Sequence, residues 1–332
     1  MAATSEPDGG DATHATTFAV IGDFGQVRKR YIAQVAQLVT HWQPTFIATV
    51  GDNRYEPSTY RETVGRHYCA FTGRHHSAHG DSMCRTRRRV NAFFPVIGNH
   101  DAANITEYNA YFTLPGAGVN STRTSGSNRF YDVRHEHIHL FFVDCYASVN
   151  ETERQKRWLQ AQLAVSSAVW KLVLLHEPPF SSGAAHGSNA RFRWPFAAWG
   201  AHIIMSGNDH HYERVERDGA VYVVNGIGGG PLFGIGVPIP GSVVRRGRSY
   251  GAVRVIATGR SLRLECVSVL GEVMDAAHYR RGMPLSSPAL HMPPGPSVGV
   301  MAAACTGTAA ILVAAVTATV CAIRGGAGRG TV

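Results

Sequence analysis

Five short apolar segments of this chain each end in a turn, and a side chain able to bind a metal ion follows at once. Carboxylate and amide oxygens mixed with imidazole nitrogens suit a pair of divalent or trivalent metal ions. The pattern therefore predicts a metal-dependent hydrolase. The candidate residues, with the apolar segment before each, are Asp23 (18–21), Asp52 (46–50), Asn99 with His100 (93–97), His176 (172–175), and Asn208 with His210 (202–206).

The elements that must position these side chains follow from the same segments. An apolar run of about 4–8 residues between turn residues is typical of a buried β-strand. Apolar residues at helical spacing over 28–42 and 153–163 alternate with the strands, which predicts an α/β domain over residues 18–275. In open α/β sheets the ligand site lies beyond the carboxyl ends of the strands. We therefore expect one rim to collect all five groups.

The composition limits the partners that such a domain would have. A chain of 332 residues with 44% hydrophobic content can bury one large core, or a core with appendages. Its formal net charge of +9 comes mainly from arginine, and such a charge suits nucleic acid, anionic lipid or a phosphorylated substrate. The sequence has no nucleic-acid-binding motif and no basic stripe interleaved with aromatic residues. A diffuse, arginine-biased composition is favoured, and we expect no nucleic-acid partner.

The two ends of the chain differ from this domain. Residues 1–17 are polar, which predicts a disordered lead-in without a signal peptide. Residues 276–298 are rich in proline and serine, which is typical of a linker. Residues 299–324 contain a long uncharged run, which predicts a single-pass membrane helix. A helix buried at the end of the domain would have a similar composition. A short basic tail, 325–332, would follow this C-terminal anchor.

A polar insertion over residues 61–89 interrupts the alternation of strands and helices. Its histidines and arginines form either a solvated basic loop or a lid that attracts an anionic substrate. Cys69 and Cys84 lie within it, and they could form a disulfide or remain free thiols. A disulfide would favour an oxidising compartment, whereas an anchor without a signal peptide favours the cytosol. The sequence therefore leaves the side of the membrane open, and it leaves the oligomeric state open as well.

Five sequence blocks contain these candidate residues in a fixed order. They are Gly22-Asp23-Phe24-Gly25, Gly51-Asp52-Asn53-Arg54-Tyr55, Gly98-Asn99-His100-Asp101, Leu175-His176 and Gly207-Asn208-Asp209-His210. In this order they resemble the calcineurin-like metallophosphoesterase superfamily, and within it the purple acid phosphatases of the tartrate-resistant type. The resemblance covers roughly residues 18–275. It implies an α/β/β/α sandwich with the active site at the carboxyl ends of the strands.

The resemblance also implies a dinuclear metal centre. A tyrosinate ligand favours Fe³⁺, because a highly charged cation lowers the pKa of the phenol. The second ion would be divalent Fe, Zn or Mn. The implied ligands are Asp23, Tyr55 and His210 for the first ion, Asn99 and His176 for the second, and Asp52 as the bridge between them.

For such a centre the expected reaction is the hydrolysis of a phosphomonoester. Two cations about 3.5–4 Å apart would clamp the phosphoryl oxygens and activate a water as the attacking hydroxide. His100 would donate a proton to the leaving alcohol, a contribution of about 10²–10⁴-fold, or would only orient Asn99. His186, on a glycine-containing loop, is a candidate phosphate contact. Phosphodiester or nucleotide hydrolysis is an alternative, because this fold hosts many phosphoesters.

Three positions depart from the family pattern. Asn208 stands where the family has a histidine that binds the second metal, and an amide oxygen is the weaker ligand for zinc. Glu177 stands where the family often has a second histidine, which could shift the site toward harder metals. His211 is one residue out of register with the missing imidazole. A catalytically weakened relative that binds phosphate or a partner is therefore a further alternative.

Overall fold

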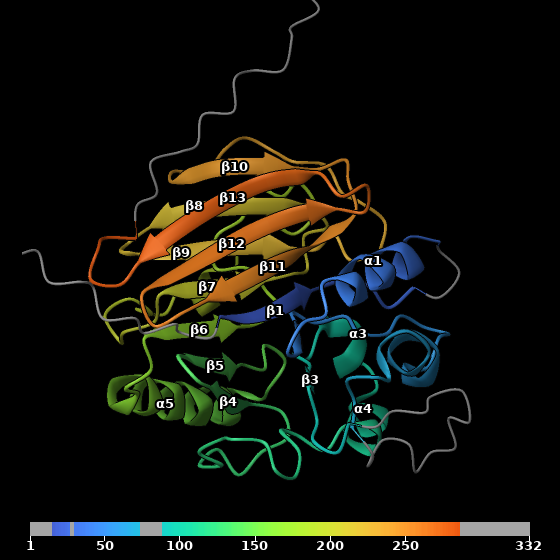
Figure 1. The fold of residues 1–332 in the computed structure, drawn as a ribbon, viewed down its shortest axis with the longest axis horizontal. Coiled ribbons are helices and arrows are strands. Elements are labelled where there is room, and N and C mark those ends of the chain that lie inside the picture. The colour runs from blue at the N-terminus through green and yellow to red at the C-terminus, as the bar shows by residue number, and fades with distance from the viewer. Residues whose placement is uncertain (1–14, 27–29, 74–87, 286–332) are drawn as a thin grey trace, which may run out of the picture. The chain divides into compact units, whose positions relative to one another are not determined.

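The apolar segments of the chain form strands of two β-sheets (Figure 1). The computed structural model describes residues 15–26, 30–73 and 88–285. Sheet A contains β1 (Thr16–Ile21), β2 (Ile47–Thr49), β3 (Phe93–Phe94), β11 (Gly251–Ala257), β12 (Ser261–Ser268) and β13 (Val273–Arg280). Sheet B contains β4 (Tyr131–His135), β5 (Ile138–Phe142), β6 (Trp170–Leu174), β7 (Ile203–Ser206), β8 (Tyr212–Arg217), β9 (Ala220–Asn225) and β10 (Ser242–Arg246).

The strand order explains how the two sheets share the candidate residues. Sheet A has the order β13-β12-β11-β1-β2-β3, and sheet B has the order β10-β8-β9-β7-β6-β5-β4. Strands β1, β2 and β3 are parallel, as are β5, β6, β7 and β9. All five predicted strands are confirmed, as is a mixed α/β sandwich. Strands β1, β2 and β3 lie in sheet A whereas β6 and β7 lie in sheet B, so the rim that collects the candidate residues is shared by two sheets.

Alternation along the strands of sheet B builds two cores. Successive side chains of a strand point to opposite faces. Leu140 and Phe142 of β5 join the core that sheet B shares with sheet A. Phe141, between them, packs with Leu159 and Leu163 of helix α5 (Val149–Val165). Sheet B is therefore covered on both faces, which explains why its strands read as continuous apolar runs.

The two long helices form where helical spacing predicts them. Helix α1 (Arg30–His41) lies within the predicted segment 28–42 and contacts β11. Helix α5 begins earlier than the predicted segment 153–163, because the Ser148 hydroxyl caps it by accepting a hydrogen bond from the Glu151 N–H. The shorter segments are a π-helical turn (Arg61–Gly65), α2 (Arg66–Tyr68), α3 (Asn99–Ala102), α4 (Ile105–Tyr111) and a 3₁₀ turn (Ala190–Phe192).

The sheets extend beyond the predicted domain limits of 18 and 275. Strand β1 begins at Thr16, and β13 runs to Arg280, so the first residues of the predicted linker belong to a strand. In the part of the chain that the structure describes, no helix has both the length and the apolar character needed to cross a membrane. The predicted features outside the described residues are most of the lead-in (1–14), the end of the linker (286–298), the membrane helix (299–324) and the basic tail (325–332).

The insertion and the charge distribution are described in part. Residues 61–68 of the insertion 61–89 are helical, whereas residues 74–87 lie outside the described ranges. Cys69 is disulfide-bonded, and Cys84, its candidate partner, lies within residues 74–87.

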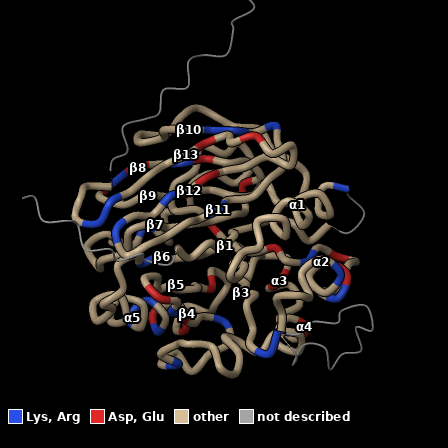
Figure 2. Tube along the Cα trace, in the orientation of Figure 1, with Lys and Arg blue, Asp and Glu red and all other residues tan. Residues whose placement is uncertain are grey.

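Figure 2 shows Lys and Arg scattered over helices, strands and loops and interleaved with Asp and Glu. This pattern agrees with the diffuse charge expected from composition.

Candidate metal centre

The turns that follow the strands adopt an uncommon backbone conformation. Asp23, Asp52 and Asn208 have φ angles of 56°, 51° and 65°. Positive φ is uncommon for residues other than glycine, and such strain costs on the order of 1–3 kcal/mol and clusters at functional sites. Three turns from two sheets thus carry strain at the point where their side chains converge.

Glycines before these residues allow the turns to approach one another. Gly51 has a φ of 98°, and a Cβ there would lie 2.3 Å from Nδ1 of His176. A Cβ on Gly98 would lie 2.1 Å from Oδ1 of Asp52. Neither position can hold a larger residue without displacing the candidate ligands. The repeated glycine in the sequence blocks is therefore a packing requirement of the centre.

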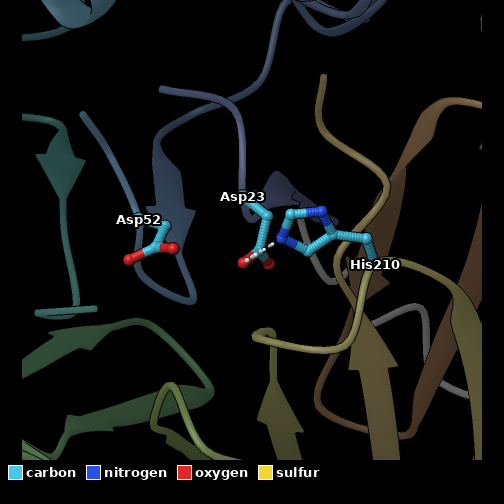
Figure 3. A group of neighbouring side chains, drawn as sticks. All are labelled: Asp23, Asp52 and His210. Atoms are coloured by element: carbon cyan, nitrogen blue, oxygen red, sulfur yellow. Dashed lines mark ion pairs between the residues drawn. The ribbon is translucent and has the colours of Figure 1, made fainter. Parts of the chain in front are cut away.

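Asp23, Asp52 and His210 form one group in which a ligand atom of each lies within 4.8 Å of the others. Figure 3 shows the His210 imidazole directed at the Asp23 carboxylate, and the Nε2 to Oδ1 distance is 3.3 Å. Both carboxylates are buried. Burial raises the pKa of Asp52 to about 6, with His176 opposing and the charge of Asp23 adding to the shift. Two buried carboxylates beside an imidazole suit a bound cation, which would offset this charge.

Tyr55 brings a phenol oxygen to the same group. Its Oη lies 3.1 Å from Nε2 of His210, and the residue is 8% exposed. Burial, together with the charges of Asp23 and Asp52, raises the pKa of Tyr55 well above its usual value. A bound cation would act in the opposite direction. The phenol therefore fits the centre as a ligand only when a cation is present.

The tautomers of the two buried histidines follow from their carbonyl partners. Nδ1 of His176 lies 2.7 Å from the Val50 carbonyl, and Nδ1 of His210 contacts the Pro231 carbonyl. Because a carbonyl oxygen can only accept, each Nδ1 carries a hydrogen, and Nε2 is the ring nitrogen that faces the centre, where its lone pair becomes available to a metal ion once Nε2 is deprotonated. Such carbonyl partners are typical of metal-binding histidines.

A second group of possible metal ligands adjoins Asp52. Nε2 of His176 is 3.1 Å from Oδ1 of Asn99 and 3.6 Å from Oδ1 of Asp52. The structure thus brings together the residues that the resemblance assigns to two ions, with Asp52 touching both sets. Asn99 begins helix α3, so its position is fixed by the turn at Gly98.

The three departures from the family pattern have distinct positions. The backbone N–H of Asn208 donates to both carboxylate oxygens of Asp23, at 3.1 and 3.2 Å. His211 is buried, and its Nε2 lies 3.3 Å from Oε2 of Glu213. Glu177 accepts a hydrogen bond from the side-chain amide of Asn189. His211 and Glu177 are thus engaged with other residues, and neither replaces the missing imidazole in this structure.

The two predicted catalytic histidines occupy different environments. The backbone N–H of His100 donates to Asp52 at 3.0 Å, and its ring, 4.3 Å from that of Tyr55, belongs to a side chain that is 43% exposed. Burial lowers the pKa of His100, with Asp101 opposing. His186 is exposed. Both side chains therefore face solvent, where a substrate can reach them.

Sequence reasoning missed the aromatic wall beside the centre. The Phe233 ring stacks on that of His210 with 4.0 Å between centroids, and His186 lies 5.6 Å from Phe233. Phe233 therefore links His186 to a candidate ligand. Phe233 lies in a glycine-rich stretch between two strands, and nothing in that stretch of sequence indicates a role at the centre.

Two residues inside the quoted blocks also received no role from the sequence. Asn53 is buried, accepts a hydrogen bond from Thr49 at 2.6 Å and donates to Asp101 at 2.8 Å. Asp101 also accepts from the Gly98 N–H at 2.9 Å. This network ties the turn that carries Asp52 to the turn that carries Asn99. Their presence beside candidate ligands in both blocks was a signal that could have found them.

Comparison with known proteins places this centre in a family. A model of the calcineurin-like phosphoesterases matches residues 16–212. The chain is 26% identical to purple acid phosphatase 1 of Ipomoea batatas over 216 residues, which is 60% of this chain and 43% of that protein. It is 25% identical to the Fe(3+)-Zn(2+) purple acid phosphatase 12 of Arabidopsis thaliana, over 64% of this chain and 46% of that protein. The chain thus spans less than half the length of these relatives.

Solved structures show the same fold at low sequence identity. The purple acid phosphatase PPD1 from yellow lupin seeds superposes with a TM-score of 0.61 and 15% identity, covering 81% of this chain and 54% of that chain. GAP50, the anchor in the inner membrane complex of Plasmodium, gives a TM-score of 0.62 and 17% identity, covering 81% and 90%. On the family match and the sequence relatives together, the chain belongs to the calcineurin-like phosphoesterase family and is similar to its purple acid phosphatases.

Proposed function

We propose that this chain is a metal-dependent phosphomonoester hydrolase of the purple acid phosphatase type. The observation that carries the proposal is the convergence of Asp23, Asp52 and His210, whose ligand atoms lie within 4.8 Å of one another in a buried setting. Buried carboxylates are costly unless they are paired or bind a metal. The family match supports phosphoester chemistry at this position.

The donor set divides into two sites that share one carboxylate. A phenol and an imidazole with carboxylates suit Fe³⁺, and an amide with an imidazole suits a divalent ion such as Fe, Zn or Mn. Bound cations would supply charge neutralisation for the phosphate and would acidify a water molecule for attack on phosphorus. The proposed ligands are Asp23, Tyr55 and His210 for the first ion, Asn99, His176 and Asn208 for the second, and Asp52 for both.

The histidines at the mouth of the centre would handle protons and the substrate. His100 is held by its backbone bond to Asp52 and is solvent-exposed, so its imidazole can meet the leaving alcohol. General acid catalysis of this kind contributes about 10²–10⁴-fold. His186, whose ring lies beside that of Phe233, would contact a phosphoryl oxygen. Together they would orient the ester and complete the proton transfer to its leaving group.

A second candidate function is phosphate or partner binding without turnover. Its basis is Asn208, which removes an imidazole from the second ion. One structural neighbour with the same fold is described as an anchor in a membrane complex, so a structural role exists among proteins of this fold. Hydrolysis of phosphodiesters or nucleotides is a variant of the leading proposal, because this fold hosts enzymes that act on many phosphoesters.

One experiment separates these candidates. The chain is loaded with iron plus zinc or manganese, its metal content is measured, and p-nitrophenyl phosphate is compared with bis(p-nitrophenyl) phosphate as substrate. We expect two ions per chain, faster turnover of the monoester, and loss of turnover in Asp52→Asn. Faster turnover of the diester would favour the phosphodiesterase variant. One ion or none, with no turnover of either ester, would favour the binding protein.

A further inference from the structure

Asp209 precedes His210 in the chain, but its side chain bonds the loop of residues 181–187. The carboxylate is fully buried, with 0% of the residue exposed. A buried carboxylate requires hydrogen-bond donors at both oxygens, and one loop provides three of them. The donors are the Ser181 hydroxyl at 2.6 Å, the His186 N–H at 3.0 Å and the Gly187 N–H at 2.9 Å.

The backbone of the same loop packs directly against the Asp209 carboxylate at Gly183. A Cβ on Gly183 would lie 2.2 Å from Cγ of Asp209, so no larger residue fits there without moving the loop. The Gly183 N–H also donates to the Ser181 hydroxyl at 2.9 Å. Ser181 therefore connects the carboxylate to Gly183 through one hydroxyl group. The loop is shaped around Asp209 along most of its length.

A second segment, residues 233–236, closes the other side of the loop. The Ala184 N–H donates to the Gly234 carbonyl at 3.0 Å, and the Gly236 N–H donates to the Ser182 carbonyl at 2.6 Å. Phe233 is held in turn by its N–H, which donates to the His210 carbonyl at 3.0 Å. The two segments and the turn 208–210 are thus joined by backbone hydrogen bonds.

We propose that Asp209 is a positioning residue that acts through His186. Its carboxylate fixes the loop backbone at His186 itself, and this places the imidazole against Phe233, which stacks on His210. The Asp209 carboxylate bonds the loop, and Asp209 is not among the proposed metal ligands. The catalytic part of this inference rests on the proposed function, in which His186 contacts the phosphoryl group.

Asparagine cannot replace this carboxylate. An amide offers one acceptor oxygen, and its NH₂ group would face an N–H or O–H donor. Asp209→Asn therefore breaks at least one of the three bonds while it preserves the volume of the side chain. Asp132 provides a matched control, because it is also buried and also accepts bonds from neutral donors, including Thr122 and Ser121.

The kinetic test compares Asp209→Asn, His186→Ala, the double variant and Asp132→Asn at equal metal content. We expect Asp209→Asn to lower kcat/KM by about 10–100-fold, a range typical of residues that orient an active group. The double variant should be no slower than His186→Ala, and both should show the same pH profile. Asp132→Asn should keep its kcat/KM. Losses that multiply in the double variant, or loss of metal in Asp209→Asn, would overturn the proposal.

A second readout does not depend on turnover. Hydrogen exchange at the amides of residues 186 and 187 should be slow in the wild type, faster in Asp209→Asn and unchanged in Asp132→Asn. If Asp209→Asn does not fold, Ser181→Ala removes a single donor and should speed the same exchange to a smaller extent. Unchanged exchange in the folded variant would reject the positioning role. A wild type that exchanges slowly but hydrolyses no ester would reject the proposed function alone.

Discussion

Tyr55 and His210 meet at the centre, with Oη of Tyr55 3.1 Å from Nε2 of His210. The two residues come from different sheets, because Tyr55 follows β2 and His210 follows β7. Nε2 of His210 also lies 3.3 Å from Asp23. A phenol oxygen, an imidazole nitrogen and a carboxylate oxygen therefore face one small volume, as a ferric site requires.

Tyr55→Phe should abolish the visible charge-transfer band of the iron-loaded protein. The band requires a tyrosinate ligand, and the substitution removes only the oxygen while it keeps the buried ring. Absorbance spectra of the wild type and the variant at equal iron content measure the effect. Tyr146→Phe is the matched control, because Tyr146 also lies near a candidate ligand, with its ring 6.1 Å from that of His176, but is not a proposed ligand. A band that survives in Tyr55→Phe would contradict the proposed ligand.

Asn208→His should strengthen binding of the second ion. The backbone of residue 208 has a φ of 65°, a region in which histidine, like asparagine, is enriched, so the exchange adds an imidazole at little cost in strain. We expect zinc affinity to rise by about 10-fold or more, because imidazole suits zinc better than an amide. Metal titration followed by elemental analysis measures it. Asn189→His, on the neighbouring loop, should leave zinc affinity unchanged.

The order of the candidate ligands could be predicted from the sequence because each one follows its own strand. Asp23 and Asp52 come directly after the short apolar runs that became β1 and β2. The sequence also predicted that His211, one residue out of register, does not replace the missing imidazole. His211 accordingly faces Glu213 and not the centre. Local spacing was sufficient for these features.

The missed features depend on contacts between distant segments. The Asp209 carboxylate bonds the loop 181–187, and the Phe233 ring stacks on His210. Neither contact produces a periodic pattern in the sequence from which it could be predicted. The split of the five strands between two sheets depends on long-range pairing, such as that of β1 with β11. Only tertiary packing decides such pairings, so the apolar runs alone could not distinguish two sheets from one, and the two-sheet sandwich was implied only by the family resemblance.

Asp275→Asn should destabilise the protein by about 1.5–3 kcal/mol, the usual contribution of hydrogen bonds between charged groups. Asp275 of β13 accepts two bonds from the Arg214 guanidinium of β8, at 2.7 and 3.1 Å, and both side chains are buried. This pair joins sheet A to sheet B. The substitution removes the charge of Asp275, whereas Glu216 still pairs with the arginine. Urea unfolding measures the loss.

The matched control for that pair is Glu151→Gln. Glu151 bonds Arg154 at 2.9 Å on the surface of α5, where both side chains are about half exposed. Exposed pairs contribute about 0–1 kcal/mol, so the control should change the free energy of unfolding little. Equal losses in the two variants would show that the buried pair adds nothing beyond an ordinary surface contact.

His202 should make the protein less stable as the pH falls from about 6.5 to 4. Burial, with the charge of Lys171 adding to it, lowers the pKa of His202 to about 4 in the folded protein. In the unfolded chain a histidine binds its proton near pH 6.5. Between these values only the unfolded state is protonated, so acid favours unfolding, by about 3 kcal/mol at most.

The physical cause of that pH dependence can be tested with His202→Asn. Nδ1 of His202 accepts a hydrogen bond from the Lys171 N–H at 3.0 Å, and a protonated imidazole could no longer accept it. An asparagine oxygen can accept the same bond and does not titrate, so the free energy of unfolding should fall less steeply with acid than in the wild type. Urea unfolding of the chelator-treated protein at several pH values measures both slopes. His41→Asn, at an exposed histidine of α1, should keep the wild-type slope, and parallel curves for His202→Asn would reject this explanation.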